Sequence, residues 1–188
     1  MSARSATVLF VPGLRGDVAD HWQTLLAARL PGSRTVPPLG RENLDCAGRV
    51  DALEREAAAI TGPVILVAHS GGCITVAHWA ARTRRPVHGA FLATPPDFDR
   101  PLPAGYPTLG ALEAAGWLPV PLARLPFPSL VGASSNDPLA RFDRVARLAQ
   151  AWGSELADLG AVGHLNPASG FGDWPQAQSW IARLLNNP

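Results

Sequence analysis

Four short apolar runs, each bounded by glycine or proline, place the strongest constraint on the fold of this 188-residue chain. They are ATVLFV (6–11), PVILVA (63–68), VHGAFLA (87–93) and PSLVGA (128–133). The runs are continuous and do not alternate apolar with polar residues, which is typical of strands buried on both faces of a parallel sheet. Two weaker runs predict a last strand, SELADLG (154–160), and an edge strand, RTVPPL (34–39), because prolines are tolerated at a sheet edge.

Helical patterns separate these runs. The predicted helices cover residues 19–30, 47–60, 71–82, 137–151 and 174–185. The alternation predicts a single α/β domain over residues 1–188, a three-layer sandwich in which a mostly parallel sheet of about 5–6 strands carries helices on both faces. Residues 94–127 break the alternation with eight prolines around one short helical stretch, 109–117. Long insertions in compact domains are usually functional, so this segment is a candidate cover for an active site.

Composition and charge exclude several classes of protein. The chain is 47% hydrophobic with a formal net charge of +1, unlike a disordered chain or a polybasic nucleic-acid or membrane-surface protein. Cys46 and Cys73 lack metal-ligand spacing, so we expect reduced thiols and no metal. The run 6–11 is too short for a secretory signal, and no run approaches the roughly 20 apolar residues of a membrane span. We therefore expect a soluble, cytoplasmic protein.

The sequence Ala68-His69-Ser70-Gly71-Gly72 joins the second apolar run to a predicted helix. This is the strand, sharp turn and helix of a nucleophile elbow, and it differs from GxSxG only by alanine for the first glycine. Small residues on either side of the turn let strand and helix approach closely, and a helix N-terminus favours developing negative charge. The pattern predicts Ser70 as a nucleophile. The alternative is that Ser70 only caps the helix.

A serine nucleophile needs a general base, and five histidines are available. His164, in the sequence GHLNP, follows the last predicted strand and comes after Ser70, the order expected of such hydrolases, so it is the predicted base. His21 is the other contender, although it precedes Ser70. The other three histidines are excluded as the base by their positions. His69 is adjacent to Ser70, and His78 lies about 12 Å from it along the predicted helix. His88 begins a strand, at the end opposite to the one where catalytic loops gather.

The predicted acid is Asp137, which follows the fourth apolar run in the sequence SSNDP. It lies between the nucleophile and the histidine in the chain, again the expected order. Asp158 and Asp143 are the alternatives. An aspartate followed by proline also suits a helix N-cap, which is the structural alternative for Asp137.

The first apolar run ends in the glycine-containing loop VPGLRG. Its spacing is only GxxG, and no Lys-Ser/Thr follows, so a dinucleotide site or a P-loop is excluded and no cofactor is expected. In an acyl-transfer enzyme this loop would offer the backbone N–H of Leu14 to an oxyanion, and Gly71 would offer the second. The alternative for Gly13 is a tight turn that simply requires glycine.

The motifs FVPGLRG, DHWQ, VAHSGG, the Asp137 turn and GHLN span almost the whole chain. Together they resemble the small single-domain serine hydrolases of the α/β-hydrolase superfamily, the family of retinoblastoma-binding protein 9. The resemblance implies a minimal α/β-hydrolase fold, a Ser70, Asp137 and His164 triad, and esterase activity on small test esters. The stretch 44–48 lacks an acidic residue after Cys46, so binding to retinoblastoma-type pocket proteins is not implied.

These residues predict a carboxylesterase-like serine hydrolase that cleaves a small ester or other activated acyl substrate. Candidate pocket residues are His21, Trp22, His69 and Trp117, and short acyl groups are expected because the insertion offers little material to enclose a long chain. Two alternatives remain open: a binding protein that keeps the fold without turnover, and an acyltransferase that uses the same triad. The natural substrate and the oligomeric state do not follow from the sequence.

Overall fold

The computed structural model of the chain describes residues 6–16 and 18–186. The expectation that the chain carries no secretory signal rests partly on residues 1–5, which lie outside the described residues. Six strands form one sheet: β1 (Thr7–Val11), β2 (Arg34–Thr35), β3 (Val64–His69), β4 (Gly89–Ala93), β5 (Ser129–Ala133) and β6 (Glu155–Asp158). Their order is β2-β1-β3-β4-β5-β6, and every neighbouring pair is parallel. The predicted strands are confirmed, and β2 lies at an edge and ends before the two prolines.

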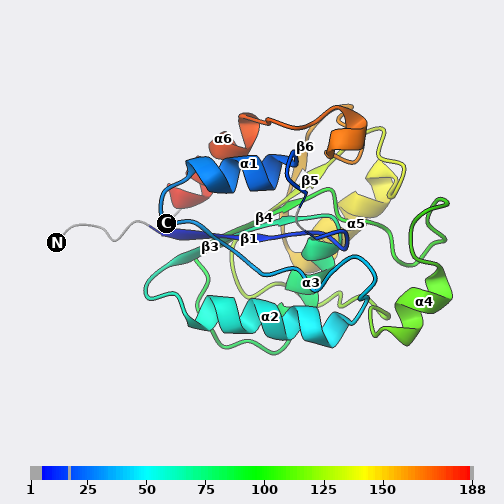
Figure 1. Cartoon of the computed structure of the whole chain (residues 1–188), viewed down its shortest axis with the longest axis horizontal. Coiled ribbons are helices and arrows are strands. Elements are labelled where there is room, and N and C mark those ends of the chain that lie inside the picture. The colour runs from blue at the N-terminus through cyan, green and yellow to red at the C-terminus, as the bar shows by residue number, and fades with distance from the viewer. Residues whose placement is uncertain (1–5, 17, 187–188) are drawn as a thin grey trace.

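Helices cover both faces of this sheet (Figure 1). They are α1 (Trp22–Arg29), α2 (Cys46–Ala58), α3 (Gly71–Ala80), α4 (Leu109–Ala114), α5 (Phe142–Trp152) and α6 (Gln176–Leu185). One face packs against α1 and α6, and the other packs against α2, α3 and α5. No helix in the part of the chain that the structure describes is long and apolar enough to cross a bilayer.

The central strands β3 and β4 are buried at every residue, which explains why their sequences are continuously apolar. Alternate side chains of β3 enter two separate cores: Leu66 packs with the α2 and α3 side, and Ile65 and Val67 pack with the α1 and α6 side. Close packing on both faces makes the carboxyl ends of these strands a rigid base for a site.

Polar side chains set the starts of two helices. The predicted helix over 137–151 begins only at Phe142, because Asp137 accepts the N–H of Leu139 at 2.8 Å and closes a turn in the preceding loop. Helix α1 begins at Trp22, and His21 caps it by accepting the N–H of Gln23 on Nδ1 at 3.2 Å.

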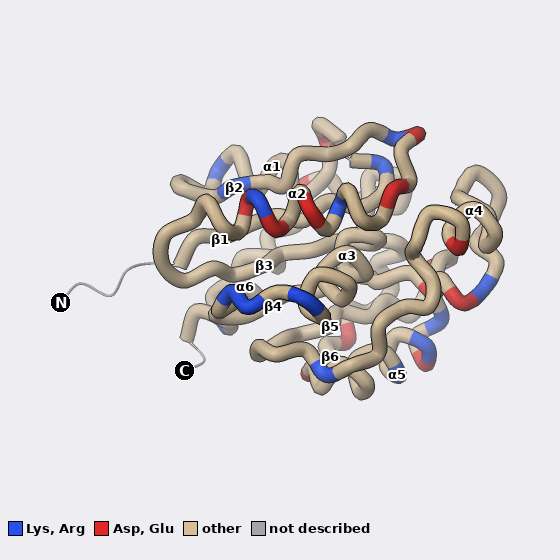
Figure 2. The backbone as a smooth tube through the Cα atoms, turned by 90° about the horizontal axis from the view of Figure 1, so that it is seen from below, with Lys and Arg blue, Asp and Glu red and all other residues tan. Residues whose placement is uncertain are grey.

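Acidic and basic residues are interspersed along the chain in Figure 2, and α2 carries both red and blue positions. Two residues of this helix form ion pairs across to other elements, Glu56 with Arg34 and Asp51 with Arg82. The mixture agrees with the formal net charge of +1.

Candidate active site

Ser70 lies in the sharp turn between β3 and α3, with a backbone conformation that L-residues rarely adopt (φ 55°, ψ −131°). Such conformations cost about 1–3 kcal/mol and persist where the surroundings enforce them, often at functional sites. The N–H of Ser70 donates to the carbonyl of Ala93 at 3.0 Å, and its carbonyl accepts the N–H of Cys73 at 2.8 Å. The Ser70 side chain makes no capping hydrogen bond to α3, so the interpretation of this residue as a helix cap is wrong.

Glycines on the far side of the turn let α3 pack directly against the loop that follows β1. A Cβ on Gly72 would lie 2.3 Å from the carbonyl oxygen of Val11 and 2.7 Å from that of Pro12. A Cβ on Gly71 would lie 2.7 Å from Cγ of Leu14. Backbone oxygens cannot move away as a flexible side chain can, so this approach of helix and loop requires glycine at 72.

Three side chains from separate loops form a hydrogen-bonded chain at the carboxyl ends of the strands. His164 Nε2 lies 2.8 Å from Ser70 Oγ, and His164 Nδ1 lies 3.0 and 2.9 Å from the two carboxylate oxygens of Asp137. The side chains of His164 and Asp137 are only 4% and 1% exposed. The carboxylate holds the proton on Nδ1, which leaves the Nε2 lone pair to accept the serine hydroxyl. The structure thus brings together the three residues that the sequence singled out.

The alternative acids lie elsewhere, and so does His78, which the sequence analysis had already excluded as the base. Asp158 accepts the N–H of Gly160, and Asp143 pairs with Arg141 at the surface. The Nε2–H of His78 donates to a main-chain carbonyl at 3.1 Å. None of the three has a hydrogen bond to Ser70 or His164 among the described residues.

The loops that carry the acid and the base are bonded to each other through Asn136, a residue that the sequence analysis did not single out. Its Oδ1 accepts the N–H of Gly163 at 2.6 Å and the hydroxyl of Ser134 at 3.0 Å. Asn136 immediately precedes Asp137, and Gly163 immediately precedes His164. This bond therefore sets the separation of the carboxylate and the imidazole.

The backbone nitrogens of Leu14 and Gly71 lie close together next to Ser70. The Leu14 nitrogen lies 3.5 Å from the position that a Cβ on Gly71 would take, and within residues 6–16 and 18–186 neither Leu14 nor Gly71 donates its N–H to a hydrogen bond. The buried guanidinium of Arg49 donates to the carbonyl of Leu14 at 3.0 Å and so fixes the peptide unit that follows it. The pair can donate to an anionic oxygen that develops near Ser70 Oγ.

His69, next to Ser70 in the chain, contacts the base loop. Its Nε2–H donates to the carbonyl of His164 at 2.9 Å, and its ring centroid lies 4.5 Å from that of His21 and 5.0 Å from that of His164. Burial lowers the pKa of His69 well below its ordinary value, and the nearby His21 and His164 lower it further. The ring is therefore neutral at pH 7, with its proton on Nε2.

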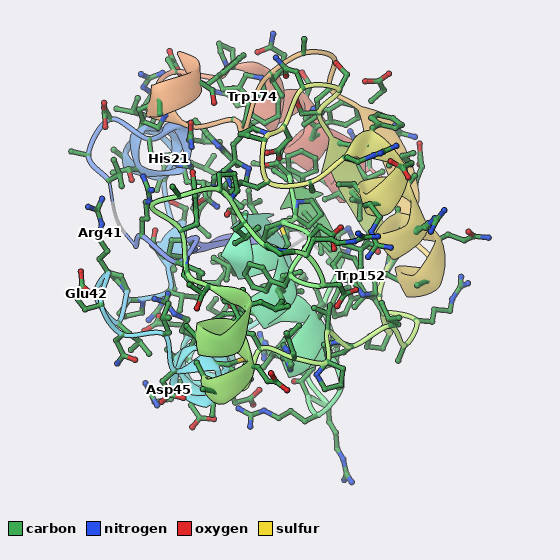
Figure 3. The ribbon with its side chains drawn as sticks, turned by 90° about the vertical axis from the view of Figure 1, so that its right-hand side faces the viewer. His21, Arg41, Glu42, Asp45, Trp152 and Trp174 are labelled. Atoms are coloured by element: carbon green, nitrogen blue, oxygen red, sulfur yellow. The ribbon has the colours of Figure 1, made fainter. Side chains whose placement is uncertain are left out.

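A cavity of about 570 Å³ opens at Ser70 and His164, a size typical of small-molecule sites. The insertion supplies part of its wall: Pro96, Phe98, Leu102, Gly105, Tyr106 and Pro107. Arg15, from the loop after β1, lies 4.7 Å from the centroid of the Tyr106 ring and so joins the two sides of the wall. Figure 3 views this end of the molecule, with Arg41 and Glu42 at its periphery.

Two of the four predicted pocket residues line this cavity, namely His21 and His69. The prediction is wrong for Trp22 and Trp117, which are buried in the protein interior instead. Trp22 packs edge-on against Trp174, with 5.3 Å between the ring centroids. The indole N–H of Trp117 donates to a main-chain carbonyl at 2.7 Å. Their large apolar surfaces are stabilised better in the core than at a wet cavity.

Three further cavity residues were not predicted as pocket residues. Arg15 and Gln23 belong to the motifs FVPGLRG and DHWQ, which could have indicated them, whereas Tyr106 lies in the insertion and carries no such signal. They reach the cavity through the tertiary arrangement of loops. The described residues include no group of three or more histidine, cysteine, aspartate or glutamate side chains placed to hold a metal ion.

The serine hydrolase family profile matches residues 8–183, from β1 to α6. The chain belongs to the serine hydrolase family. It is therefore a hydrolase, and its sheet of six parallel strands with helices on both faces is the α/β-hydrolase fold that the sequence predicted. No curated protein sequence matches this chain.

Solved structures of other hydrolases are similar to this serine hydrolase. A protein described as a YdeN-like hydrolase, from Pectobacterium atrosepticum, shares 31% identity over 97% of this chain and 91% of that one, with a TM-score of 0.83. The ydeN gene product of B. subtilis shares 19% identity over 97% and 100%, with a TM-score of 0.77. The esterase domain of a Rhodothermus marinus protein shares 18% identity over 98% and 90%, with a TM-score of 0.66. The last two likenesses are those of the fold.

Proposed function

We propose that this serine hydrolase cleaves a small ester or other activated acyl substrate through an acyl-enzyme, as carboxylesterases do. The observation that carries the proposal is the hydrogen-bonded chain from Ser70 Oγ to His164 Nε2 at 2.8 Å and from His164 Nδ1 to Asp137 Oδ2 at 2.9 Å. A serine hydroxyl is a weak nucleophile by itself, and this chain supplies both the base and the group that holds its tautomer.

In the proposed mechanism, Ser70 Oγ attacks the acyl carbonyl while His164 Nε2 takes its proton. The carboxylate of Asp137 stabilises the imidazolium that results, and the N–H groups of Leu14 and Gly71 donate to the tetrahedral oxyanion. His164 then gives the proton to the leaving group, which departs and leaves an acyl-serine. Water attacks this ester with His164 again as base, which releases the acid and restores the hydroxyl.

The wall contributed by the insertion supports a partial cover over the site. Phe98, Leu102 and Tyr106 present apolar surface to the cavity, which is suited to an acyl group or a small leaving group. We propose that residues 94–127 shield the acyl-enzyme and that short acyl groups are preferred.

A fluorophosphonate probe tests the activated serine. We expect one stoichiometric adduct on Ser70, read by intact and peptide mass, which is abolished by Ser70→Ala and slowed at least about 10³-fold by His164→Ala. Ser135→Ala, at an exposed serine in the loop before Asp137, is the matched control and should label like the wild type. Absence of an adduct on folded wild-type protein would instead favour a binding protein without turnover.

Product analysis tests hydrolysis against acyl transfer. With p-nitrophenyl butyrate and a competing alcohol or amine, a hydrolase releases mainly butyric acid. A new ester or amide as the main product would show an acyltransferase instead.

A further inference from the structure

Gln23 lies on the cavity wall with its side-chain amide held in one orientation. It is 5% exposed, and its Nε2 donates to the carbonyl of Val67 in β3 at 2.9 Å and to that of Val11 in β1 at 3.4 Å. Because both partners are carbonyls, the nitrogen must face them, and the oxygen must face the other way. Oε1 accepts no hydrogen bond from any described residue. It is also not one of the fully buried polar atoms that lack a hydrogen-bond partner. It is therefore open to the cavity that Gln23 lines.

A second acceptor lies on His69, which lines the same cavity. The Nε2–H of His69 donates to the carbonyl of His164 at 2.9 Å, so in the neutral ring Nδ1 carries a lone pair. Within the described ranges Nδ1 has no hydrogen-bond partner, and it too is not one of the fully buried polar atoms that lack one. The His69 ring centroid lies 5.0 Å from that of His164, so the ring that carries this lone pair is next to the base.

The two acceptors are uncharged, and the described part of the cavity lining offers little to balance a cation. Among the described residues that line the cavity, Glu42 is the single acidic one, and it lies at the periphery of the face, away from His21 (Figure 3). A neutral donor therefore suits this wall better than an ammonium group.

We propose that Gln23 Oε1 and His69 Nδ1 form an acceptor pair that selects substrates with an uncharged hydrogen-bond donor, an amide N–H or a hydroxyl, near the scissile carbonyl. The inference rests on the proposed function for the site of cleavage. A substrate without the donor leaves buried acceptors unpaired, and sites built to bond a substrate N–H or O–H discriminate strongly against analogues that lack it.

The test compares p-nitrophenyl esters of N-acetylglycine and of 4-oxopentanoic acid, which differ by N–H against CH₂. Each kcat/KM value is divided by the rate constant for hydroxide-catalysed hydrolysis of the same ester. For the wild type we expect this normalised value to be at least about tenfold higher for the N-acetylglycine ester. His69→Gln keeps an N–H toward the His164 carbonyl and loses the ring acceptor, and Gln23→Met loses the amide oxygen. Each should reduce the preference to about threefold or less. The control Leu102→Ala changes the apolar wall and should keep the ratio.

A binding measurement without turnover separates this inference from the proposed function. Calorimetry with the Ser70→Ala variant should show that N-acetylglycine methyl ester binds at least about fivefold more tightly than methyl 4-oxopentanoate. Equal kcat/KM for the two nitrophenyl esters, with normal labelling of Ser70, would overturn the acceptor pair and leave the proposed function intact. Selective binding without labelling or turnover would support the acceptor pair and overturn the proposed function. Equal binding would overturn the acceptor pair.

Discussion

Replacement of Gly72 by alanine tests whether the close approach of α3 to the loop after β1 positions the nucleophile. The new Cβ would meet the Val11 oxygen at 2.3 Å, so helix and loop must separate by roughly 1 Å to reach an ordinary carbon–oxygen contact. That movement carries the N–H of Gly71 away from that of Leu14 and the hydroxyl of Ser70 away from His164 Nε2. A misplacement of about 1 Å can cost about 10²-fold in rate, so we expect fluorophosphonate labelling of Ser70 to slow by that factor.

The stability effect of this change sets two contributions against each other. Helix propensity alone would make alanine more stable than glycine by about 1 kcal/mol, whereas overpacking a tight interface costs about 1–3 kcal/mol. A contact with backbone oxygen cannot relax through a rotamer change, so overpacking should win, with a net loss of up to about 2 kcal/mol in urea unfolding.

Gly110→Ala is the matched control, because a Cβ at this helical position in α4 meets nothing within 4 Å. It should label at the wild-type rate and gain up to about 1 kcal/mol. If Gly72→Ala labelled and unfolded like the wild type, the close approach would not position the nucleophile, and the reasoning would be refuted.

Three further predictions concern the ion pairs, the thiols and the acyl group. Arg144→Ala should lower the free energy of unfolding by about 1–2 kcal/mol, because Asp97, whose side chain is 10% exposed, loses an ion-pair partner at 2.8 Å. The control is Arg141→Ala, at a side chain that is 84% exposed, which should leave urea unfolding unchanged. Cys46 and Cys73 should resist iodoacetamide at pH 8 until the protein unfolds, since both are buried and burial raises the pKa of Cys46 to about 11; rapid alkylation of the native protein would contradict this. Among p-nitrophenyl esters, kcat/KM should fall beyond about eight carbons, and a steady rise with chain length would exclude a preference for short acyl groups.

Local sequence predicted the strands and the nucleophile turn because both depend on neighbours in the chain. The run before Ser70 is apolar throughout since β3 is buried on both faces, and the glycines after it are required where the helix meets the loop. The candidate base and acid followed from their order and strand-end positions. The start of α5 did not, because Asp137 could equally cap a helix or bond a distant histidine, and only the folded loop decides between them.

Side-chain direction was the part that the sequence could not supply. Trp22 and Trp117 stand next to cavity-lining segments, yet each turns into the core. Gln23 lies one position after Trp22 and reaches the cavity wall, because its amide finds two strand carbonyls there. A polar side chain in an apolar helix carries no periodic signal of such partners, which belong to strands far away in the chain.

The base loop shows how neighbours in sequence hold an irregular segment in place. His69, next to Ser70, donates to the carbonyl of His164, and Asn136, next to Asp137, accepts the N–H of Gly163. The segment that carries the imidazole is thus bonded on one side to the residue before the nucleophile and on the other to the residue before the acid. Because these bonds join main chain to side chain, the imidazole position is coupled to both partner loops, and loss of either bond should disturb the 2.8 Å contact with Ser70 more than the fold itself.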